Sequence, residues 1–446
     1  MVLRISTDRA LPPGPRRPSP AQLHAWITEP ERLYASCRRR FGPTFTLRLF
    51  GQPPKVFVSD PADVRAVFRG SDEVLHAGRA NAVVEPIVGS TSILVLDGSP
   101  HRVQRRVLAP LFRGRAVQPA LGDLVALCER AVADLPRGEA FALLPHAQAL
   151  TLRIILAALL GVRQGPELDA LYDRTDALMR IAGHPLLLVP PARRRLGSLT
   201  PWARFDDHQQ ALRADLAERF ARARVEPDRT DLLARIVHAG GEGGPERDVE
   251  LADAVLTLLV AGHETSATGL AWAMHHLAHH PGEQERLRAD LRAAFGDGPV
   301  DVATLAEIPR LTAIIYETLR LTPPLTQVGR ILAAPFEVGG YSLPAGVGVV
   351  PCIWLAHRDP AQWPEPERFL PERFLPLERP DPSAWFPFGG GARRCLGESF
   401  AMHELRAALA VLVLRCRVQP AGAPSRARRR GVVLAPGDGV RLRIAD

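Results

Sequence analysis

The feature that most restricts the fold is a glycine-rich segment, Phe-Gly-Gly-Gly-Ala-Arg-Arg-Cys-Leu-Gly, which begins at Phe388 and Gly389 and ends at Gly397. Because glycine has no Cβ, the backbone of this segment can turn tightly and can approach a bulky flat ligand without clashes. Residues 398–413 have a helical pattern, and the start of a helix stabilises a sulfur anion on Cys395. Such a thiolate can bind iron and favour O–O cleavage. A buried structural cysteine is the alternative, but the glycines and paired arginines favour the ligand.

The length and composition favour a large folded chain in a reducing compartment. With 446 residues, 46% of them hydrophobic, the sequence can bury a sizeable core. No run reaches the roughly 18 apolar residues of a membrane-spanning helix, and the N-terminus lacks the apolar stretch of a secretory signal. The five cysteines are scattered and odd in number, which argues against a disulfide framework. We therefore expect a soluble cytoplasmic protein without a transmembrane anchor.

The basic charge of the chain comes almost entirely from arginine, because Lys55 is the only lysine among 56 basic residues. Arginine runs at residues 38–40, 193–195 and 428–430 lack interleaved aromatic residues and any nucleic-acid motif. We expect each run to be a solvated face, and we expect no nucleic-acid partner. The net charge of +8 does suit an acidic protein partner, because opposite charges steer association.

The order of patterns predicts a mainly α-helical fold with a smaller β-sheet portion. Residues 1–20 end in a proline-rich stretch that we expect to be extended or loosely packed. Most of residues 101–295 are helical in pattern. Strands are predicted at residues 45–50 and 55–59, in a hairpin at 336–343 and in a second hairpin at 432–444.

A long helical pattern over residues 252–280 contains Ala-Gly-His-Glu-Thr-Ser, from Ala261 to Ser266. Glycine in a helix interior costs about 1 kcal/mol relative to alanine, and a hydroxyl can compete for the carbonyl one turn earlier. We expect a local break that leaves room for a diatomic ligand and water beside a cofactor. Thr265 would donate a hydrogen bond to bound oxygen, and Glu264 would relay protons from solvent. The alternative is a helix bend with a surface acid.

Two metal sites compete for the same helix. A zinc-protease motif starting at His263 fails, because the second histidine that it requires is Ala267. Four histidines near the helix end form two pairs, each one turn apart: His275/His279 and His276/His280. Such pairs can chelate a metal. Because no acidic third ligand is evident, we expect them to form a solvent-facing helix end.

An acid and a base lie three residues apart at Glu317 and Arg320. On an exposed helix such a pair contributes only about 0.2–0.5 kcal/mol. A further arginine, Arg373, follows in a proline-rich loop shortly before the cysteine segment. One carboxylate shared by two guanidiniums would pin that loop beneath the metal site.

Four basic residues are candidates for holding the anionic edge of a macrocycle. His101 and Arg105 open a helix one turn apart and share a face. Arg330 and Arg393 are further candidates. For each of these residues taken alone, the alternative interpretation is an exposed side chain with no role in binding.

Together and in this order, these motifs resemble those of the cytochromes P-450, which are haem-thiolate monooxygenases. The resemblance covers most of the chain and includes residues 357–366, from His-Arg-Asp-Pro to Trp-Pro-Glu-Pro. It implies the cytochrome P-450 fold, a triangular helical body that sandwiches haem b. It also implies that residues 21–446 form a single catalytic domain of the soluble bacterial type.

The resemblance assigns roles to the residues singled out above. The haem contacts would be Cys395 as proximal iron ligand, Phe388, Gly389, Gly397 and Ala261 around the ring, and His101, Arg105, Arg330 and Arg393 at the propionates. Glu317, Arg320 and Arg373 would support the cysteine loop. Glu264 and Thr265 would be the acid–alcohol pair that delivers protons to dioxygen, with glutamate where soluble bacterial members often have aspartate.

The same resemblance implies the reaction and its partners. One oxygen atom of O2 would enter a C–H or C=C bond, and the other would become water. Electrons derived from NAD(P)H would arrive through a separate ferredoxin or flavodoxin.

The segments expected to face the substrate are rich in apolar residues: 80–93, 182–189, the Ala261 face of the long helix, and Leu325, Thr326 and Val328. A mostly apolar pocket favours terpenoid, steroid or fatty-acyl substrates over charged ones. Two other functions stay open. One is a haem-thiolate isomerase or dehydratase that needs no external electrons, against which the Glu264-Thr265 pair argues. The other is a non-catalytic haem-thiolate sensor or binding protein.

Overall fold

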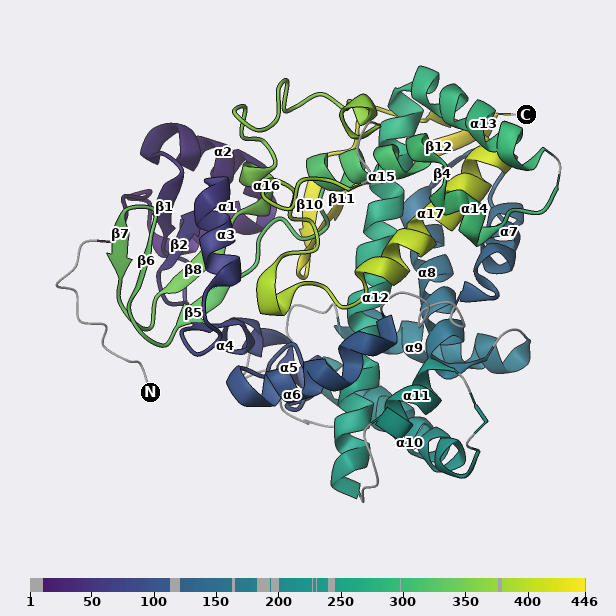
Figure 1. Cartoon of the computed structure of the whole chain (residues 1–446), viewed down its shortest axis with the longest axis horizontal. Helices are drawn as coiled ribbons and strands as arrows, with labels where there is room; N and C mark the ends of the chain where they lie inside the picture. The colour runs from purple at the N-terminus through teal and green to yellow at the C-terminus, as the bar shows by residue number, and fades with distance from the viewer. Residues whose placement is uncertain are drawn as a thin grey trace.

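The computed structural model describes residues 11–112, 121–162, 165–182, 193, 200–226, 228–229, 231–239, 245–296, 298–375 and 379–445. A β-rich portion lies beside a larger helical body (Figure 1). The two ends of the sequence both contribute strands, and the middle is helical. The mainly α fold with a smaller sheet portion is therefore confirmed.

A five-stranded sheet, in the order β1-β2-β8-β5-β3, forms the β-rich portion. Its strands are β1 (Thr44–Leu47), β2 (Lys55–Val58), β3 (Leu75–His76), β5 (Arg330–Leu332) and β8 (Gly348–Pro351). β2 and β8 pair in parallel, with Val56 opposite Val349, and the remaining pairs are antiparallel. The strand pair predicted at residues 45–59 is confirmed as β1 and β2. Parallel pairing of β2 and β8 brings distant parts of the chain together.

Helices and a small hairpin surround this sheet. They are α1 (Ser19–Thr28), α2 (Pro30–Phe41), α3 (Pro61–Arg69), α16 (Ile353–Ala356), β6 (Phe336–Val338) and β7 (Tyr341–Leu343). The Asp60 side chain caps α3 by accepting a hydrogen bond from the Ala62 N–H at 2.8 Å. The predicted Gly-Gly hairpin is confirmed, because Gly339 and Gly340 both have positive φ, as a two-residue turn of this kind requires.

The proline-rich segment packs against β1 in its described part. The Thr46 N–H donates to the Pro13 carbonyl at 2.9 Å, and its hydroxyl donates to the Pro12 carbonyl at 2.6 Å. A Cβ on Gly14 would lie 1.9 Å from the Thr46 carbonyl oxygen, so only glycine fits there. From Pro12 to Gly14 the segment is bound to the sheet edge rather than loose. Its separation from a domain at residues 21–446 stays a prediction.

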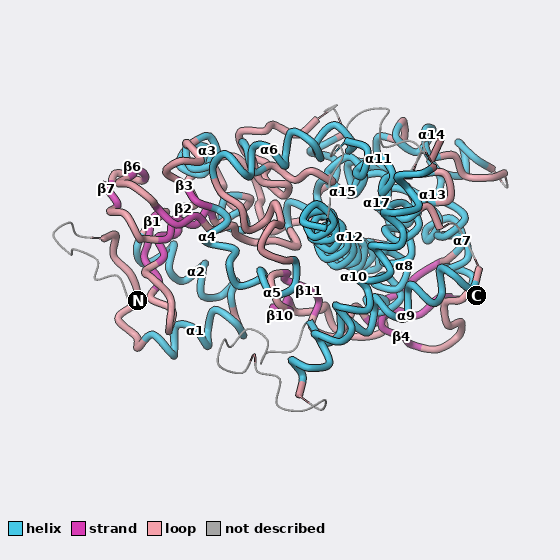
Figure 2. Tube along the Cα trace, turned by 90° about the horizontal axis from the view of Figure 1, so that it is seen from below, coloured by secondary structure: helices cyan, strands magenta, loops and turns pink. Residues whose placement is uncertain are grey.

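The helical body contains helices that range from one turn to 35 residues in length. Its helices are α4 (Ala77–Asn81), α5 (Glu85–Val88), α6 (Gly98–Leu108), α7 (Leu124–Ala133), α8 (Leu143–Leu160), α9 (Pro166–Ala182), α10 (Pro201–Val225), α11 (Leu232–Ala239), α12 (Pro245–His279), α13 (Pro281–Phe295), α14 (Val302–Ala306), α15 (Pro309–Leu321) and α17 (Glu398–Arg415). α12 lies among α8, α10, α15 and α17 and is seen nearly end-on in Figure 2. Its 35 residues make it about 50 Å long.

The break expected in this long helix is not observed. α12 is unbroken from Pro245 to His279. A Cβ on Gly262 would lie 3.4 Å from the Ile155 side chain of α8, so the glycine allows the two helices to pack closely. The Thr151 hydroxyl of α8 also donates to the His263 carbonyl at 3.0 Å. The packing of α8 therefore keeps the segment helical despite its glycine.

One helix among the described residues, α8, is long and apolar enough to cross a membrane, and 72% of it is buried inside the protein. Its buried side chains belong to the main hydrophobic cluster, together with those of α12 and α17. That degree of burial is typical of a core helix.

The predicted hairpin over residues 432–444 is wrong. β11 (Val433–Pro436) pairs with β10 (Ala427–Arg430), whereas β12 (Arg441–Ala445) lies between β4 (Ala140–Ala142) and β9 (Arg417–Pro420). The Pro-Gly-Asp-Gly turn does form, with the Gly439 N–H donating to the Pro436 carbonyl at 3.2 Å. It leads the chain to α8, where Leu143 and Leu144 donate to the carbonyls of Val440 and Gly439. Pairing with β4 and β9 therefore replaces pairing with β11.

Truncating a side chain in the interior of α12 should destabilise the whole body. Leu256 is fully buried, so Leu256→Ala should lower the free energy of unfolding by about 2–5 kcal/mol. Val249, on the same helix, is 51% exposed, and Val249→Ala should change it by less than about 0.5 kcal/mol. Urea unfolding followed by circular dichroism measures both. Equal losses in the two variants would contradict this placement of α12.

Candidate active site

The cysteine segment is a tight turn between α3 and the start of α17. The Cys395 N–H donates to the Phe388 carbonyl at 2.9 Å, which closes the turn. Gly389 and Gly391 have φ of +67° and +62°, which side chains rarely adopt. A Cβ on Gly391 would lie 1.8 Å from the Phe68 carbonyl oxygen of α3. The glycines therefore allow both the turn and its close approach to α3.

The surroundings of Cys395 make its thiol hard to ionise. Its surface is accessible to solvent, yet the surrounding protein is dense enough that burial raises the pKa of the thiol to about 11. The Gly397 N–H opposes the rise by hydrogen bonding. The thiol therefore needs a nearby cation to ionise at neutral pH.

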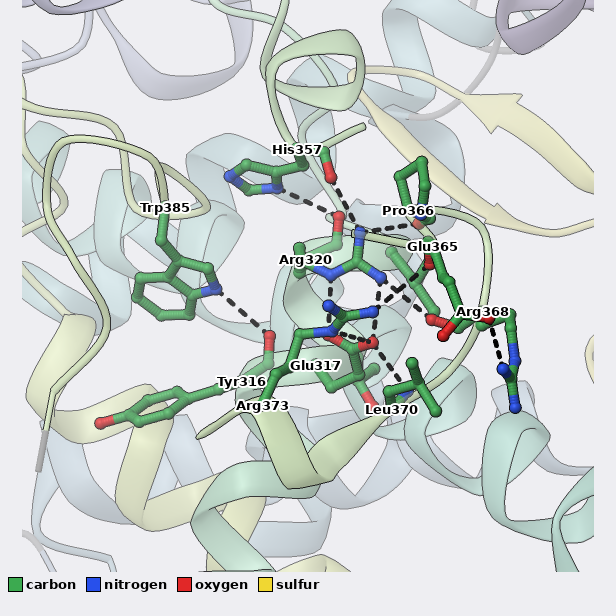
Figure 3. Close-up of polar contacts among 12 residues, drawn as sticks. Tyr316, Glu317, Arg320, His357, Glu365, Pro366, Arg368, Leu370, Arg373 and Trp385 are labelled. Carbon is green, nitrogen blue, oxygen red and sulfur yellow. Dashed lines mark hydrogen bonds and ion pairs between the residues drawn. The ribbon is translucent and has the colours of Figure 1, made fainter. Parts of the chain in front are cut away.

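A buried carboxylate organises the chain that precedes the cysteine turn (Figure 3). Glu317 on α15 accepts hydrogen bonds from Arg320 at 2.7 and 2.9 Å, and neither side chain has exposed surface. Arg373 donates to the same carboxylate at 3.2 Å. The Leu370 N–H adds a fourth donor at 2.8 Å. The structure thus brings the three residues of the sequence motif together.

The two arginines extend this network to the backbone of the proline-rich loop. Arg320 donates to the carbonyls of His357 and Pro366, each at 2.8 Å. Arg373 donates to the Pro364 carbonyl at 3.0 Å. His357 in turn accepts a hydrogen bond from the Phe386 N–H at 2.7 Å. Because burial lowers the pKa of His357 to about 3, its ring is neutral and able to accept. The network therefore reaches from α15 to the residue two before Phe388.

Four basic side chains gather between α6, β5 and the cysteine turn. Arg393 donates to the Ile93 carbonyl at 3.0 Å and pairs with Asp97 at 2.7 Å. His101 and Arg330 are 1% and 6% exposed. Arg105 donates to the Arg394 carbonyl at 2.7 Å. All four positions predicted for the macrocycle edge therefore contribute to one region.

These groups repel one another electrostatically. Burial, then Arg393 and Arg105, lower the pKa of His101 to about 4. Burial, then Arg393, lower the pKa of Arg330 to about 10. Two buried nitrogens, Nδ1 of His101 and Nε of Arg393, have no hydrogen-bond partner among the described residues. A group with two carboxylates would relieve the repulsion and supply acceptors, so these residues fit haem propionates.

The other residues that we predicted to contact the haem ring lie next to open or partly open space. A Cβ on Gly389 or Gly397 would meet nothing within 4 Å. Phe388 is half-buried and packs edge-to-face with Trp385, 5.9 Å between centroids. Ala261 is exposed although it lies in the middle of α12. This exposure marks the side of α12 that faces away from the packed core.

The acid and alcohol of α12 have defined partners. The Thr265 hydroxyl donates to the Ala261 carbonyl one turn earlier at 2.7 Å, without breaking the helix. Gln148 of α8 donates to the Glu264 carboxylate at 2.8 Å. Burial raises the pKa of Glu264, whereas the Gln148 hydrogen bond and the charge of Arg430 lower it. A raised pKa lets a carboxyl hold and release a proton closer to neutral pH.

The predicted substrate-facing residues differ in exposure. Leu325 and Val328 are half-buried, whereas Thr326 is 1% exposed, and its hydroxyl lies beside Tyr34. Most of segment 182–189 lies outside the described residues. Segment 80–93 forms α5 and the short turns around it.

The solvent-facing helix end expected for the four histidines is wrong for His275 and His276, whereas His280, just after α12, is exposed. His275 is buried, and the His276 ring stacks on Phe369 at 4.7 Å between centroids. Trp272 packs against both histidines. The loop that carries Phe369 covers this end of the helix, which periodicity alone does not reveal. Within the described residues, no group of three histidine, cysteine or acidic side chains could hold a metal ion.

Several contributors to the site carry no sequence signal. Gln148 is a single amide in the apolar pattern of α8. Asp97 pairs with Arg393 and also accepts from the N–H groups of Gly78 and Arg79. Its place just before α6 looks like an ordinary helix cap, yet its side chain makes no cap hydrogen bond.

Comparisons with known proteins agree with this site. The cytochrome P450 family profile matches residues 12–440. "Putative cytochrome P450 135B1" of Mycobacterium bovis is 36% identical over 445 residues, covering 98% of this chain and 92% of the relative. "Putative cytochrome P450 137" of Mycobacterium tuberculosis is 35% identical over 429 residues, covering 94% and 87%. The solved structure of retinoic acid bound cyanobacterial CYP120A1 aligns with a TM-score of 0.83 at 24% identity, covering 98% and 100%.

The chain therefore belongs to the cytochrome P450 family, and its fold is the cytochrome P450 fold. The family consists of haem-containing, iron-dependent monooxygenases, so the protein is an oxidoreductase of this class.

Neutralising the shared carboxylate should loosen the proline-rich loop. Glu317→Gln leaves two buried guanidiniums without their anion and should lower the free energy of unfolding by about 3–5 kcal/mol. Glu365→Gln is the control, because Glu365 forms an exposed pair with Arg368, and it should change stability by less than about 0.5 kcal/mol. Thermal and urea unfolding of the holoprotein measure both. A Glu317→Gln variant as stable as the control would disprove the role of this network.

Proposed function

We propose that the chain inserts one oxygen atom from O2 into a hydrophobic small molecule. The observation that carries this proposal is the solvent-accessible Cys395 just before α17, close to a cluster of four basic side chains. A thiolate-bound haem iron supplies the activation of dioxygen when it is present. The residues around it then have the tasks of binding, orientation and proton delivery.

The binding tasks fall to residues already located. Cys395 would ligate the iron, whose charge keeps the sulfur ionised despite its raised pKa. His101, Arg105, Arg330 and Arg393 would pair with the propionates.

The proton tasks fall to α12. Glu264, half-buried and bonded to Gln148, would pass protons from solvent toward the hydroxyl of Thr265. Thr265 follows Glu264 directly, and its hydroxyl donates to the Ala261 carbonyl one turn earlier. The Thr265 hydroxyl would therefore connect Glu264 with the Ala261 face of α12.

The substrate and electron source follow from the surroundings and the family. The exposed Ala261 and the half-buried Leu325 and Val328 support an apolar pocket for terpenoid, steroid or fatty-acyl molecules. Electrons would come from NAD(P)H through a separate acidic ferredoxin or flavodoxin, which a chain of net charge +8 would attract. The cytoplasm remains the compartment that we infer.

The intact Glu264–Thr265 pair favours this reaction over the two alternative functions. An isomerase, a dehydratase or a haem-thiolate sensor has no need of a proton path to dioxygen. Substrate-dependent consumption of NAD(P)H with a surrogate ferredoxin system would separate the monooxygenase from both.

Replacing the proposed iron ligand tests the centre of the proposal. Cys395→Ser should change the absorption of the reduced carbon monoxide complex, because a neutral hydroxyl donates less electron density to iron than a thiolate. Cys352→Ser is the control, since Cys352 is buried in another cluster, and it should keep the parental spectrum. A Cys395→Ser spectrum identical to the parent's would refute the assignment.

Removing the alcohol of α12 tests proton delivery. Thr265→Ala should keep NAD(P)H consumption but lower product per NAD(P)H by about tenfold or more, since general acid–base groups contribute about 10²–10⁴-fold. Ser266→Ala changes the next residue, which is buried, and should leave this ratio close to the parental value. The ratio of product to NAD(P)H is the measurement. Unchanged coupling in Thr265→Ala would exclude the proposed role.

A further inference from the structure

One face of α8 carries the contacts that hold the acid-bearing turn of α12. Figure 2 shows the two helices side by side. The Thr151 hydroxyl donates to the His263 carbonyl at 3.0 Å, and the Gln148 amide donates to the Glu264 carboxylate at 2.8 Å. Thr151 and Gln148 are three residues apart on α8 and therefore share a face. This face contacts both the backbone and the acidic side chain of the same turn.

The amide of Gln148 is an unusual group for its position. α8 is a mostly apolar helix, and a polar group in such surroundings is costly unless it is hydrogen-bonded. Gln148 and Glu264 are both half-buried. A hydrogen bond to an ionised carboxylate is about twice as strong as one between neutral groups. The contact therefore satisfies the amide and stabilises the ionised form of Glu264.

The same contact sets the direction of the carboxylate. Successive side chains on a helix point about 100° apart, so Glu264 and Thr265 face different directions although they are adjacent. Thr265 shares the face of Ala261, four residues earlier, whereas the bond to Gln148 turns Glu264 toward α8. Gln148 therefore determines where the carboxylate lies relative to the alcohol.

His263 does not perform this task. Its Nε2 lies 3.6 Å from the same carboxylate oxygen, which is beyond hydrogen-bond distance. Burial lowers the pKa of His263 to about 4, although the charge of Asp176 on α9 opposes this shift. The ring is therefore neutral near pH 7 and places no positive charge beside Glu264.

One arginine of β10 also acts on Glu264. The charge of Arg430 lowers the pKa of the carboxyl, but less than the hydrogen bond from Gln148 does. Arg429 lies instead over the Trp26 ring at 4.1 Å, so the solvated face expected for residues 428–430 is wrong for Arg429. The direct contact with Gln148 is therefore the larger of the two influences that favour the ionised carboxylate.

We propose that Gln148 is a positioning residue for proton delivery, which holds Glu264 toward α8 and keeps it ionised until it takes up a proton. This inference rests on the proposed monooxygenase function and adds to it a residue that acts through Glu264. An acid must be protonated before it can deliver a proton, so delivery declines as the pH rises above the pKa of Glu264. A change at Gln148 should move that limit.

Infrared titration of the protonated Glu264 carboxyl, with the Glu264→Gln spectrum subtracted, measures this pKa on the holoprotein. Gln148→Leu removes the donor and should raise the pKa by about one unit, since a hydrogen bond to a charged group contributes about that much. Gln148→Lys places a cation beside the carboxylate and should lower the pKa. Loss of packing alone would not shift the two variants in opposite directions.

The consequence for proton delivery is measured as product per NAD(P)H against pH. Geraniol, progesterone and dodecanoic acid serve as probes of the three proposed substrate classes. The pH at which this ratio falls by half should move up in Gln148→Leu and down in Gln148→Lys. Opposite infrared shifts with an unchanged pH dependence of the ratio would contradict the role in delivery.

Arg153→Leu is the matched control, because Arg153 is a half-buried polar residue of the same helix that lies over the Tyr172 ring of α9, at 3.8 Å. It should leave the pKa of Glu264 and the pH limit at their parental values. Infrared shifts of the same sign in both Gln148 variants, or shifts no larger than that of the control, overturn the inference.

Failure of the proposed function has a different signature. In that case the parent's carbon monoxide complex would not depend on Cys395, whereas the opposite infrared shifts of the two Gln148 variants would remain. A parent with a Cys395-dependent spectrum, in which the pKa of Glu264 does not respond to Gln148, would overturn the Gln148 inference alone.

Discussion

The Glu317 carboxylate receives two hydrogen bonds from Arg320 and one from Arg373, and no part of it reaches solvent. Burying such a charge is costly unless every lone pair is satisfied, and the Leu370 N–H supplies the fourth donor. The two arginines donate their other N–H groups to backbone carbonyls of the proline-rich loop. The path of that loop is therefore fixed by hydrogen bonds to its main chain. Because the neutral His357 also accepts from Phe386, the same network sets where the cysteine turn begins.

The basic cluster on the other side of the turn has the opposite character. Its cations lower one another's pKa, and Asp97 is the acid paired with Arg393. Here the cations repel one another and a bound dianion would relieve that repulsion, whereas at Glu317 each arginine has a carboxylate partner. The two regions therefore differ in whether their charged groups have partners within the protein. The cysteine turn joins them, with Arg393 in the turn and Phe386 just before it.

Sequence reasoning found the fold class and the residues whose chemistry is local. Glycines in the Cys395 turn, a carboxylate three residues before an arginine, and a Gly-Gly hairpin each leave a pattern within a few positions. The sequence-based predictions were wrong where contacts between distant segments determine strand pairing or burial. The tail pairs with β4 and β9 because α8 presents N–H groups to Gly439 and Val440. His276 is covered by a loop about ninety residues later in the chain, whose Phe369 stacks on its ring. Neither periodicity nor motif spacing contains such contacts.

The hydrogen bond from the Thr265 hydroxyl to the Ala261 carbonyl has a consequence for the direction of proton flow. A hydroxyl has one hydrogen and two lone pairs. With the hydrogen directed at the backbone, the free valences of Thr265 are both lone pairs. On the Ala261 face of α12 the Thr265 hydroxyl is therefore a hydrogen-bond acceptor. It can accept a hydrogen bond from a donor such as water, and it can donate its own hydrogen there only if the bond to the Ala261 carbonyl breaks.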